Sequence, residues 1–165
     1  MTTEEKAIAY IKATTAFGGD DYQNYSGDYS YENRVEFESW LAEQTKASGI
    51  TLYRGYCFES HYWDDCFVQE GSIIGEDQMT AEMDLPAFTL GQIRAVNYMN
   101  EFGGGVGNCG TKVFFEIQTN GKYFVDISAH SRYKENEFRC VRGTQLLVES
   151  ITQKGGYIHI KCTEA

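Results

Sequence analysis

The segment Ile50-Thr51-Leu52-Tyr53-Arg54-Gly55 marks the point at which the sequence changes from helical to extended patterning. Its β-branched and aromatic residues favour a strand. Before it, apolar residues recur at helical spacings of three and four, and Gly49 ends this part of the chain. We therefore predict helices built mainly from the first 48 residues and a first strand that begins at Ile50.

Beyond this strand, four more runs have the composition and alternation of strands: residues 111 to 118, 122 to 127, 145 to 150 and 156 to 162. One helix interrupts them, from Leu90 to Phe102, for which we expect Ile93, Val96 and Asn97 to face inward. Helices first and strands later are typical of an α+β protein rather than a parallel α/β sheet. Because the chain has one proline, no linker and no repeat, we predict a single domain over residues 1–165.

Charge and length exclude several classes of protein. The chain has 165 residues, with 24 acidic and 14 basic side chains, a formal net charge of −10 and a pI near 4.7. An acidic chain lacks the basic face that nucleic acids and anionic membranes require, so neither is expected as a partner. No run approaches the ~20 apolar residues that cross a bilayer, and no signal peptide is recognisable, which predicts a cytoplasmic protein.

The cysteines and glycines suggest no cofactor site. Five cysteines without CxxC spacing favour reduced, mostly buried thiols over a disulfide framework. The spacing of Cys57, His61 and Cys66 matches no standard zinc site, and a fourth ligand is missing, so no metal is expected. The glycine run at residues 103–110 contains a GxGxxG match, but a helix precedes it and a strand follows it, which reverses the order of a dinucleotide-binding loop.

Two charged elements have both a structural and a functional interpretation. On a strand, Arg54 shares the inward face with Ile50 and Leu52, so it needs either an internal carboxylate or an anionic ligand. In an extended segment, Glu135 and Glu137 project to one side, where they could serve proton transfer or bind hydroxyls and cations. The structural alternative for this pair is a solvated turn.

Taken in order, these elements resemble ADP-ribosyltransferases of the arginine, serine/threonine, glutamate (R-S-E) type, which include bacterial toxins and phage enzymes. Leu52-Tyr53-Arg54-Gly55 resembles the family's "YRG" strand, Ala87-Phe88-Thr89 resembles its "F-[ST]-T-S" element, and Glu135-Asn136-Glu137 resembles its E-x-E motif. Residues 121–128 resemble the strand that enters the family's substrate-recognition loop, and residues 143–148 its "G-x-x-F-x-V" strand. The chain departs from the pattern at Leu90-Gly91, which leaves Thr89 as the only hydroxyl of its element.

The resemblance implies N-terminal helices packed on two small, mostly antiparallel sheets that flank a cleft for NAD. It implies that Arg54, Gly55 and Thr89 bind NAD, that Glu137 holds the ribose 2′-hydroxyl, and that Glu135 receives the acceptor. NAD is then a substrate, no metal is needed, and the E-x-E pair implies transfer to an arginine of a basic protein. A toxin or phage effector delivered into a host cell is one such role.

Two other functions remain open. A domain of this fold could bind NAD or a protein surface without turnover, or it could hydrolyse NAD as a glycohydrolase.

Overall fold

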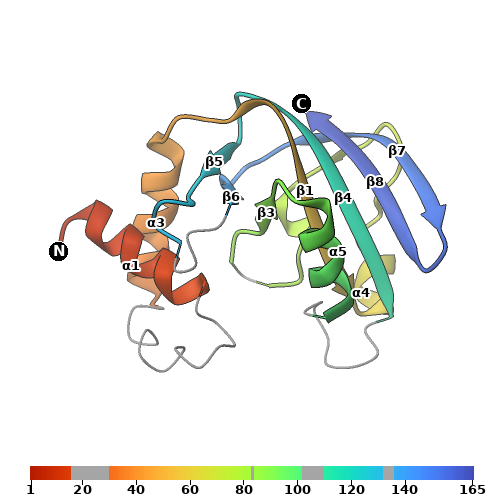
Figure 1. Ribbon diagram of the computed structural model, residues 1–165, viewed down its shortest axis with the longest axis horizontal. Coiled ribbons are helices and arrows are strands. Elements are labelled where there is room, and N and C mark those ends of the chain that lie inside the picture. The colour runs from red at the N-terminus through yellow and green to blue at the C-terminus, as the bar shows by residue number, and fades with distance from the viewer. Residues whose placement is uncertain (16–29, 83, 102–109, 132–135) are drawn as a thin grey trace.

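The computed structural model of the chain describes residues 1–15, 30–82, 84–101, 110–131 and 136–165. Its helices are α1 (Thr3–Thr15), α3 (Tyr31–Glu43), α4 (Ser60–Asp64), the 3₁₀ helix η2 (Glu76–Gln78) and α5 (Gln92–Glu101). Its strands are β1 (Ser48–Phe58), β2 (Ile73–Ile74), β3 (Ala87–Thr89), β4 (Thr111–Asn120), β5 (Phe124–Asp126), β6 (Glu137–Cys140), β7 (Leu146–Lys154) and β8 (Tyr157–Glu164). Figure 1 shows α1 and α3 side by side at one end of the molecule, with the long strands at the other.

The predicted α+β class is confirmed, and the strands join into one sheet of order β2-β7-β8-β4-β1-β3-β6-β5. All neighbours are antiparallel except β4 and β8, which run parallel. The pair Tyr53 and Thr89 gives the register between β1 and β3. The two sheets that we expected are therefore a five-stranded part and the three-stranded part β3-β6-β5, joined through β1 and β3.

One apolar cluster collects side chains from every strand of this sheet. It contains Ile74 of β2 and Phe124 of β5, which belong to the two edge strands. Residues from opposite edges can share a cluster only if the sheet curls, so the cluster fills the concave side. On β8 the expected alternation holds, because Ile160 and Cys162 are buried in this cluster and Lys161 is exposed.

Helices α1, α3 and α5 cover the other face of the sheet in two places. A second cluster packs α1 and α3 against Val125 and Ile127 at the β5 end. A third places Ala95 and Met99 of α5 on Phe114 of β4, next to β1. Helices α1 and α3 therefore support the three-stranded part, whereas α5 supports the five-stranded part.

Gly55 permits the close contact between α5 and β1. A Cβ atom built at this residue would lie 1.8 Å from the carbonyl oxygen of Ala95 and 2.8 Å from the Cβ of Met99. Neither atom can move without shifting the helix, so a glycine is required here for packing.

This contact also corrects our prediction for the inward face of α5. Ala95 and Met99 are buried, whereas Ile93 is 78% exposed and Asn97 is also exposed. Of the three residues predicted inward, only Val96 packs against the core. The apolar pattern pointed to Ile93, but the close approach to Gly55 selects the small Ala95 as the contact residue.

The cysteine prediction was partly wrong. Cys57 is disulfide-bonded, whereas Cys66, Cys140 and Cys162 are free. Burial raises the pKa of both Cys140 and Cys162 to about 12, so these two thiols stay protonated at neutral pH. Spacing along the chain did not reveal the bridge because pairing depends on distance in the fold. The cysteine count therefore gives no argument for a reducing compartment.

Among the described residues, no helix has the length and apolar character of a membrane span.

We predict that Gly55→Ala lowers the free energy of unfolding by about 3 kcal/mol or more, because the new methyl group overlaps a backbone carbonyl. Urea denaturation followed by circular dichroism measures the change. The matched control is Gly155→Ala, at a glycine whose added Cβ would meet nothing within 4 Å. Equal stability of the two variants would show that α5 does not need the close contact.

Candidate active site

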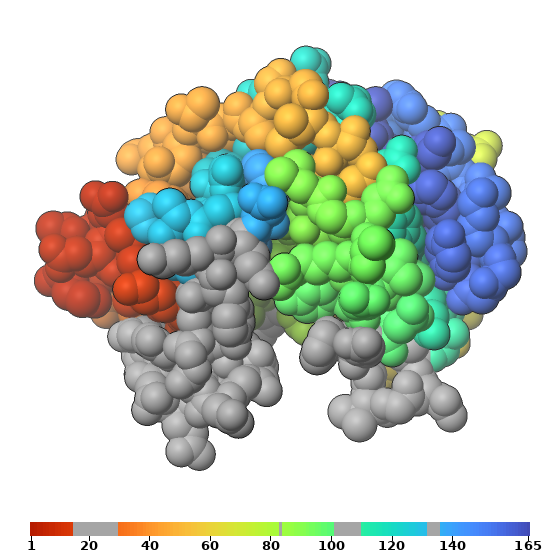
Figure 2. Space-filling model, viewed as in Figure 1, coloured from red at the N-terminus to blue at the C-terminus, as the bar shows by residue number. Residues whose placement is uncertain are grey.

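Three of the adjoining strands bring Tyr53, Thr89 and Glu137 into one row. Thr89 is the register partner of Tyr53 on one side and of Glu137 on the other. Cross-strand partners project to the same face of a sheet, so the three side chains share the face on which the helices lie. Thr89 and Glu137, which are 48 positions apart in the sequence, are therefore neighbours. Figure 2 shows the segment around β3 and α5 in contact with the segment that begins at β6.

Glu137 is the first residue of β6 and is partly accessible, with 21% of its side chain exposed. Its carboxylate oxygen Oε2 accepts a hydrogen bond from Nε of Arg139 at 3.3 Å, and Nη2 of Arg139 lies 3.3 Å from the same atom. Its backbone N–H donates to Oγ of Ser128 at 3.0 Å. The start of the strand is thus fixed, while the carboxylate still reaches the surface.

Thr89 is the last residue of β3 and is 9% exposed. Its hydroxyl oxygen accepts a hydrogen bond from the backbone N–H of Gly91 at 3.2 Å, which closes the turn into α5. Leu90, in the middle of this turn, is 39% exposed. The backbone N–H at position 91, which any residue except proline would supply, therefore orients the one remaining hydroxyl of this element.

Arg54 faces inward, as predicted, and its hydrogen-bond partners are backbone carbonyl oxygens rather than an internal carboxylate. Its Nε donates to the carbonyl oxygen of Met79 at 2.8 Å and its Nη1 to that of Ala87 at 3.0 Å. The guanidinium also lies over the ring of Tyr56, 4.8 Å from its centroid. Burial lowers the pKa of Arg54 to about 10, so it remains charged at neutral pH.

Arg54 and Glu137 do not meet through their side chains. Arg54 follows Tyr53 on β1, and successive strand residues point to opposite faces, so its guanidinium lies on the concave side. It influences the site only through the backbone, because it binds the carbonyl oxygen of Ala87, which lies two residues before Thr89 on β3. Glu135, the other predicted catalytic residue, lies outside the described residues.

Sequence reasoning missed Arg139, which is 5% exposed and contacts Glu137. The alternation along Glu137-Phe138-Arg139 already placed both charges on one face of a strand, which would have identified the pair. The segment was not predicted as a strand because β6 has only four residues.

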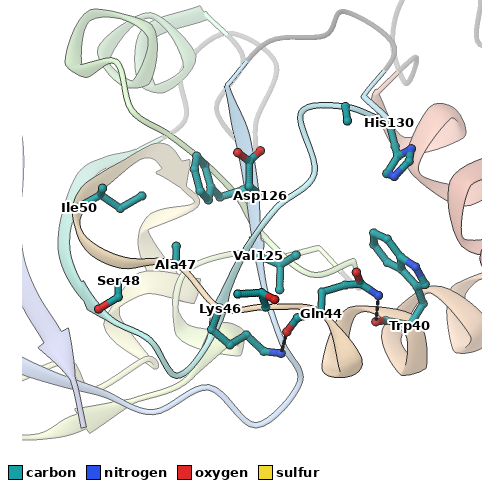
Figure 3. Close-up of a pocket in the computed structure, with 12 residues that line it drawn as sticks. Trp40, Gln44, Lys46, Ala47, Ser48, Ile50, Val125, Asp126 and His130 are labelled. Carbon is teal, nitrogen blue, oxygen red and sulfur yellow. Dashed lines mark hydrogen bonds between the residues drawn. The ribbon is translucent and has the colours of Figure 1, made fainter.

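A cavity of about 510 Å³ lies apart from these residues, and Figure 3 shows the side chains that line it. It lies at the edge strand β5, between Trp40 and His130 on one side and Ile50 on the other. Phe138, whose neighbours along β6 are Glu137 and Arg139, lines it. Because none of Arg54, Thr89 and Glu137 lines this cavity, we do not equate it with the candidate site.

No set of three or more His, Cys, Asp or Glu side chains suited to a metal ion occurs within the described ranges. The site that these ranges do contain is a carboxylate paired with a buried guanidinium, next to an oriented hydroxyl. Such a set can bind hydroxyl groups and stabilise a cation, but it has no thiol or histidine nucleophile.

The chain's fold is that of ADP-ribosyltransferases. The structure of the ADP-ribosyltransferase Vis with agmatine has a TM-score of 0.61 and 18% identity over 100% of this chain and 69% of Vis, a toxin from Vibrio splendidus. The type III effector XopAI from Xanthomonas axonopodis pv. citri has a TM-score of 0.60 and 19% sequence identity, over 100% of this chain and 68% of XopAI. An ADP-ribosyltransferase from Clostridium botulinum has a TM-score of 0.55 and 13% sequence identity, over 99% of this chain and 87% of the clostridial protein. No protein-family model and no curated protein matches the sequence.

We predict that Arg54→Met lowers the free energy of unfolding by about 3 kcal/mol, because two carbonyl oxygens lose a charged donor. Arg54→Lys should lose less, since an ammonium group can still reach one of them. Chemical denaturation measures both, with the exposed Lys154→Met as control. Wild-type stability of Arg54→Met would show that the carbonyl contacts contribute nothing, and would leave ligand binding as the reason for this arginine.

Proposed function

We propose that this protein is a mono-ADP-ribosyltransferase, which transfers ADP-ribose from NAD to an arginine of a protein acceptor and releases nicotinamide. The observation that carries the proposal is the pairing of Thr89 with Glu137 across β3 and β6, in a chain with this fold. A single catalytic domain over residues 1–165 is part of the proposal, and NAD is its substrate.

The chemistry assigns a role to Glu137. Cleavage of the bond between nicotinamide and ribose builds positive charge on the sugar, as in glycoside hydrolysis. A carboxylate held next to that ribose stabilises the charge as it develops. Glu137 suits this role because it is anchored at the start of a strand yet partly exposed. In this proposal it also binds the ribose 2′-hydroxyl.

Of the other residues that we assign to the NAD site, Thr89 contributes a hydroxyl, and Arg54 and Gly55 support the backbone. Thr89 lies beside Glu137 with an oriented hydroxyl, and it would contact the ribose side of NAD. Arg54 holds the carbonyl of Ala87, and Gly55 allows α5 to pack on β1, so both keep β3 in place. We assign Arg54 and Gly55 to the NAD site on this basis, as residues that hold β3 and α5 in position.

The proposed acceptor is a guanidinium group. Vis has been solved with agmatine, a small molecule that carries a guanidinium, which supports an arginine-like acceptor here. A carboxylate binds and orients a guanidinium well, and we assign this role to Glu135. The net charge of −10 would attract a basic partner protein.

The toxins and the effector among the similar structures support a protein that is delivered into a host cell. A phage effector that acts within the bacterial cytoplasm would have the same chemistry.

Incubation with NAD labelled in its adenylate part, with and without an arginine-containing acceptor, tests the proposal. Nicotinamide release and label in protein are followed separately. Release with labelling supports a transferase, whereas release without labelling under every acceptor condition indicates a glycohydrolase. Binding of NAD without release would indicate a non-catalytic module.

Glu137→Gln is expected to lower nicotinamide release by about 100-fold or more, because a preorganised negative charge is lost at the developing cation. NAD binding, measured by calorimetry, should survive, since the amide keeps the size of the side chain. The control is Glu149→Gln, the same change at an exposed position of β7. Release at the wild-type rate from Glu137→Gln would rule out this carboxylate as the catalytic group.

Glu135→Ala separates transfer from hydrolysis. It removes the carboxylate that orients the incoming guanidinium, so water replaces arginine as the nucleophile. We expect labelling of arginine acceptors to disappear while much of the NAD hydrolysis remains. Retained arginine labelling would remove the basis for an arginine acceptor, and equal loss of both activities would show that the two glutamates act as a unit.

A further inference from the structure

The guanidinium of Arg139 joins three parts of the chain. Besides Glu137, it contacts the carbonyl oxygen of Leu85, to which Nη1 donates at 3.1 Å, and the hydroxyl of Thr14, to which Nη2 donates at 3.1 Å. Thr14 lies in the last turn of α1 and its hydroxyl donates to the carbonyl oxygen of Ile11 at 3.0 Å. All three nitrogen atoms of the guanidinium are therefore engaged, so its orientation is fixed.

The two strands beside β6 also restrict Arg139. Its register partners are Ala87 on β3 and Val125 on β5, two small or apolar residues that pack without competing for the guanidinium. With only 6% of its side chain exposed, it cannot turn toward solvent. This arginine is thus a rigid part of the structure, in contrast to a flexible surface charge.

The contact with Arg139 gives the two oxygens of the Glu137 carboxylate different surroundings. Nε and Nη2 of Arg139 both lie 3.3 Å from Oε2. Oε1 has no hydrogen-bond or ion-pair partner within the part of the chain that the structure describes. One oxygen is therefore held from inside the protein, and the other is left for a ligand.

We infer that Arg139 is a positioning residue, which holds Oε2 of Glu137 so that Oε1 is presented to the ribose of NAD. This inference rests on the proposed function for the identity of the ligand, although the contact between the two residues does not. A glutamate side chain, with three rotatable bonds, loses alternative orientations when one carboxylate oxygen is held. Such preorganisation raises the rate of the chemical step without changing how tightly the substrate binds.

The charge of Arg139 acts in the opposite direction. A cation next to the carboxylate weakens the field that Glu137 exerts on a developing positive charge. If this electrostatic effect dominated, removal of Arg139 would speed up nicotinamide release. If orientation dominates, as we infer, removal slows it, so the sign of the change separates the two possibilities.

The first experiment tests the contact without NAD. In protein labelled with ¹⁵N-arginine, the Nε–H resonance of Arg139 is assigned from its absence in Arg139→Lys. We expect it to move upfield and to exchange faster with water in Glu137→Gln, because a neutral amide accepts a weaker hydrogen bond. Glu149→Gln should leave it unchanged. If the Nε–H resonance of Arg139 does not change in Glu137→Gln, the inference is overturned, whether or not the protein releases nicotinamide.

The second experiment measures kcat and KM for nicotinamide release. We expect Arg139→Met to lower kcat by about 10-fold or more while KM for NAD stays within about two-fold. The kcat of Arg139→Lys should lie between those of the wild type and Arg139→Met, because an ammonium group attracts the carboxylate but lacks the paired donors of the guanidinium. Arg142→Met, the same change at an arginine that contacts Glu38 and Glu76 instead, is the control.

Thr14→Val is the second variant, in case Arg139→Met does not fold. It removes one neutral contact of Nη2 and keeps the charge, so it should lower kcat slightly and leave KM unchanged. An unchanged or increased kcat in the Arg139 variants, or in Thr14→Val if only that variant folds, would overturn the inference. A wild-type protein that releases no nicotinamide would instead refute the proposed function, and the resonance of Arg139 would still decide whether it holds Glu137.

Discussion

The junction between β1 and β3 is the constraint on which the rest of the structure depends. The register pair of Tyr53 and Thr89 joins the five-stranded and three-stranded parts of the sheet. Strand β3 has only three residues, so few backbone hydrogen bonds can hold the two parts together. The junction must therefore be stabilised from both faces, and the structure provides this with α5 on one side and Arg54 on the other.

Two inward-facing arginines fix the backbone at and before β3. Arg54 binds the carbonyl oxygens of Met79 and Ala87 from the concave side, and Arg139 binds that of Leu85 from the helix side. Carbonyls outside regular structure need partners when they are buried, and a guanidinium supplies several donors at once. In a chain with a net charge of −10, two of the 14 basic side chains thus face inward, where they shape the backbone next to Glu137.

This arrangement separates what the fold supplies from what single residues supply. The fold places a threonine and a glutamate from distant parts of the chain side by side. The pairing of Glu137 with Arg139 comes from residue choice on one short strand, and it gives the carboxylate two unequal oxygens. The fold is shared with several ADP-ribosyltransferases, whereas the orientation of the glutamate is a property of this sequence.

The sequence by itself determined the order of the elements and the faces of the long strands. The switch at Ile50 and the alternation along residues 156 to 162 follow from local patterning, which does not depend on distant neighbours. For the same reason, the inward direction of Arg54 was correctly predicted. Only the tertiary structure decided what Arg54 binds, which face of α5 packs inward and that Cys57 forms a disulfide. Each of these depends on atoms brought together from far along the chain, and periodicity contains no information about such distances.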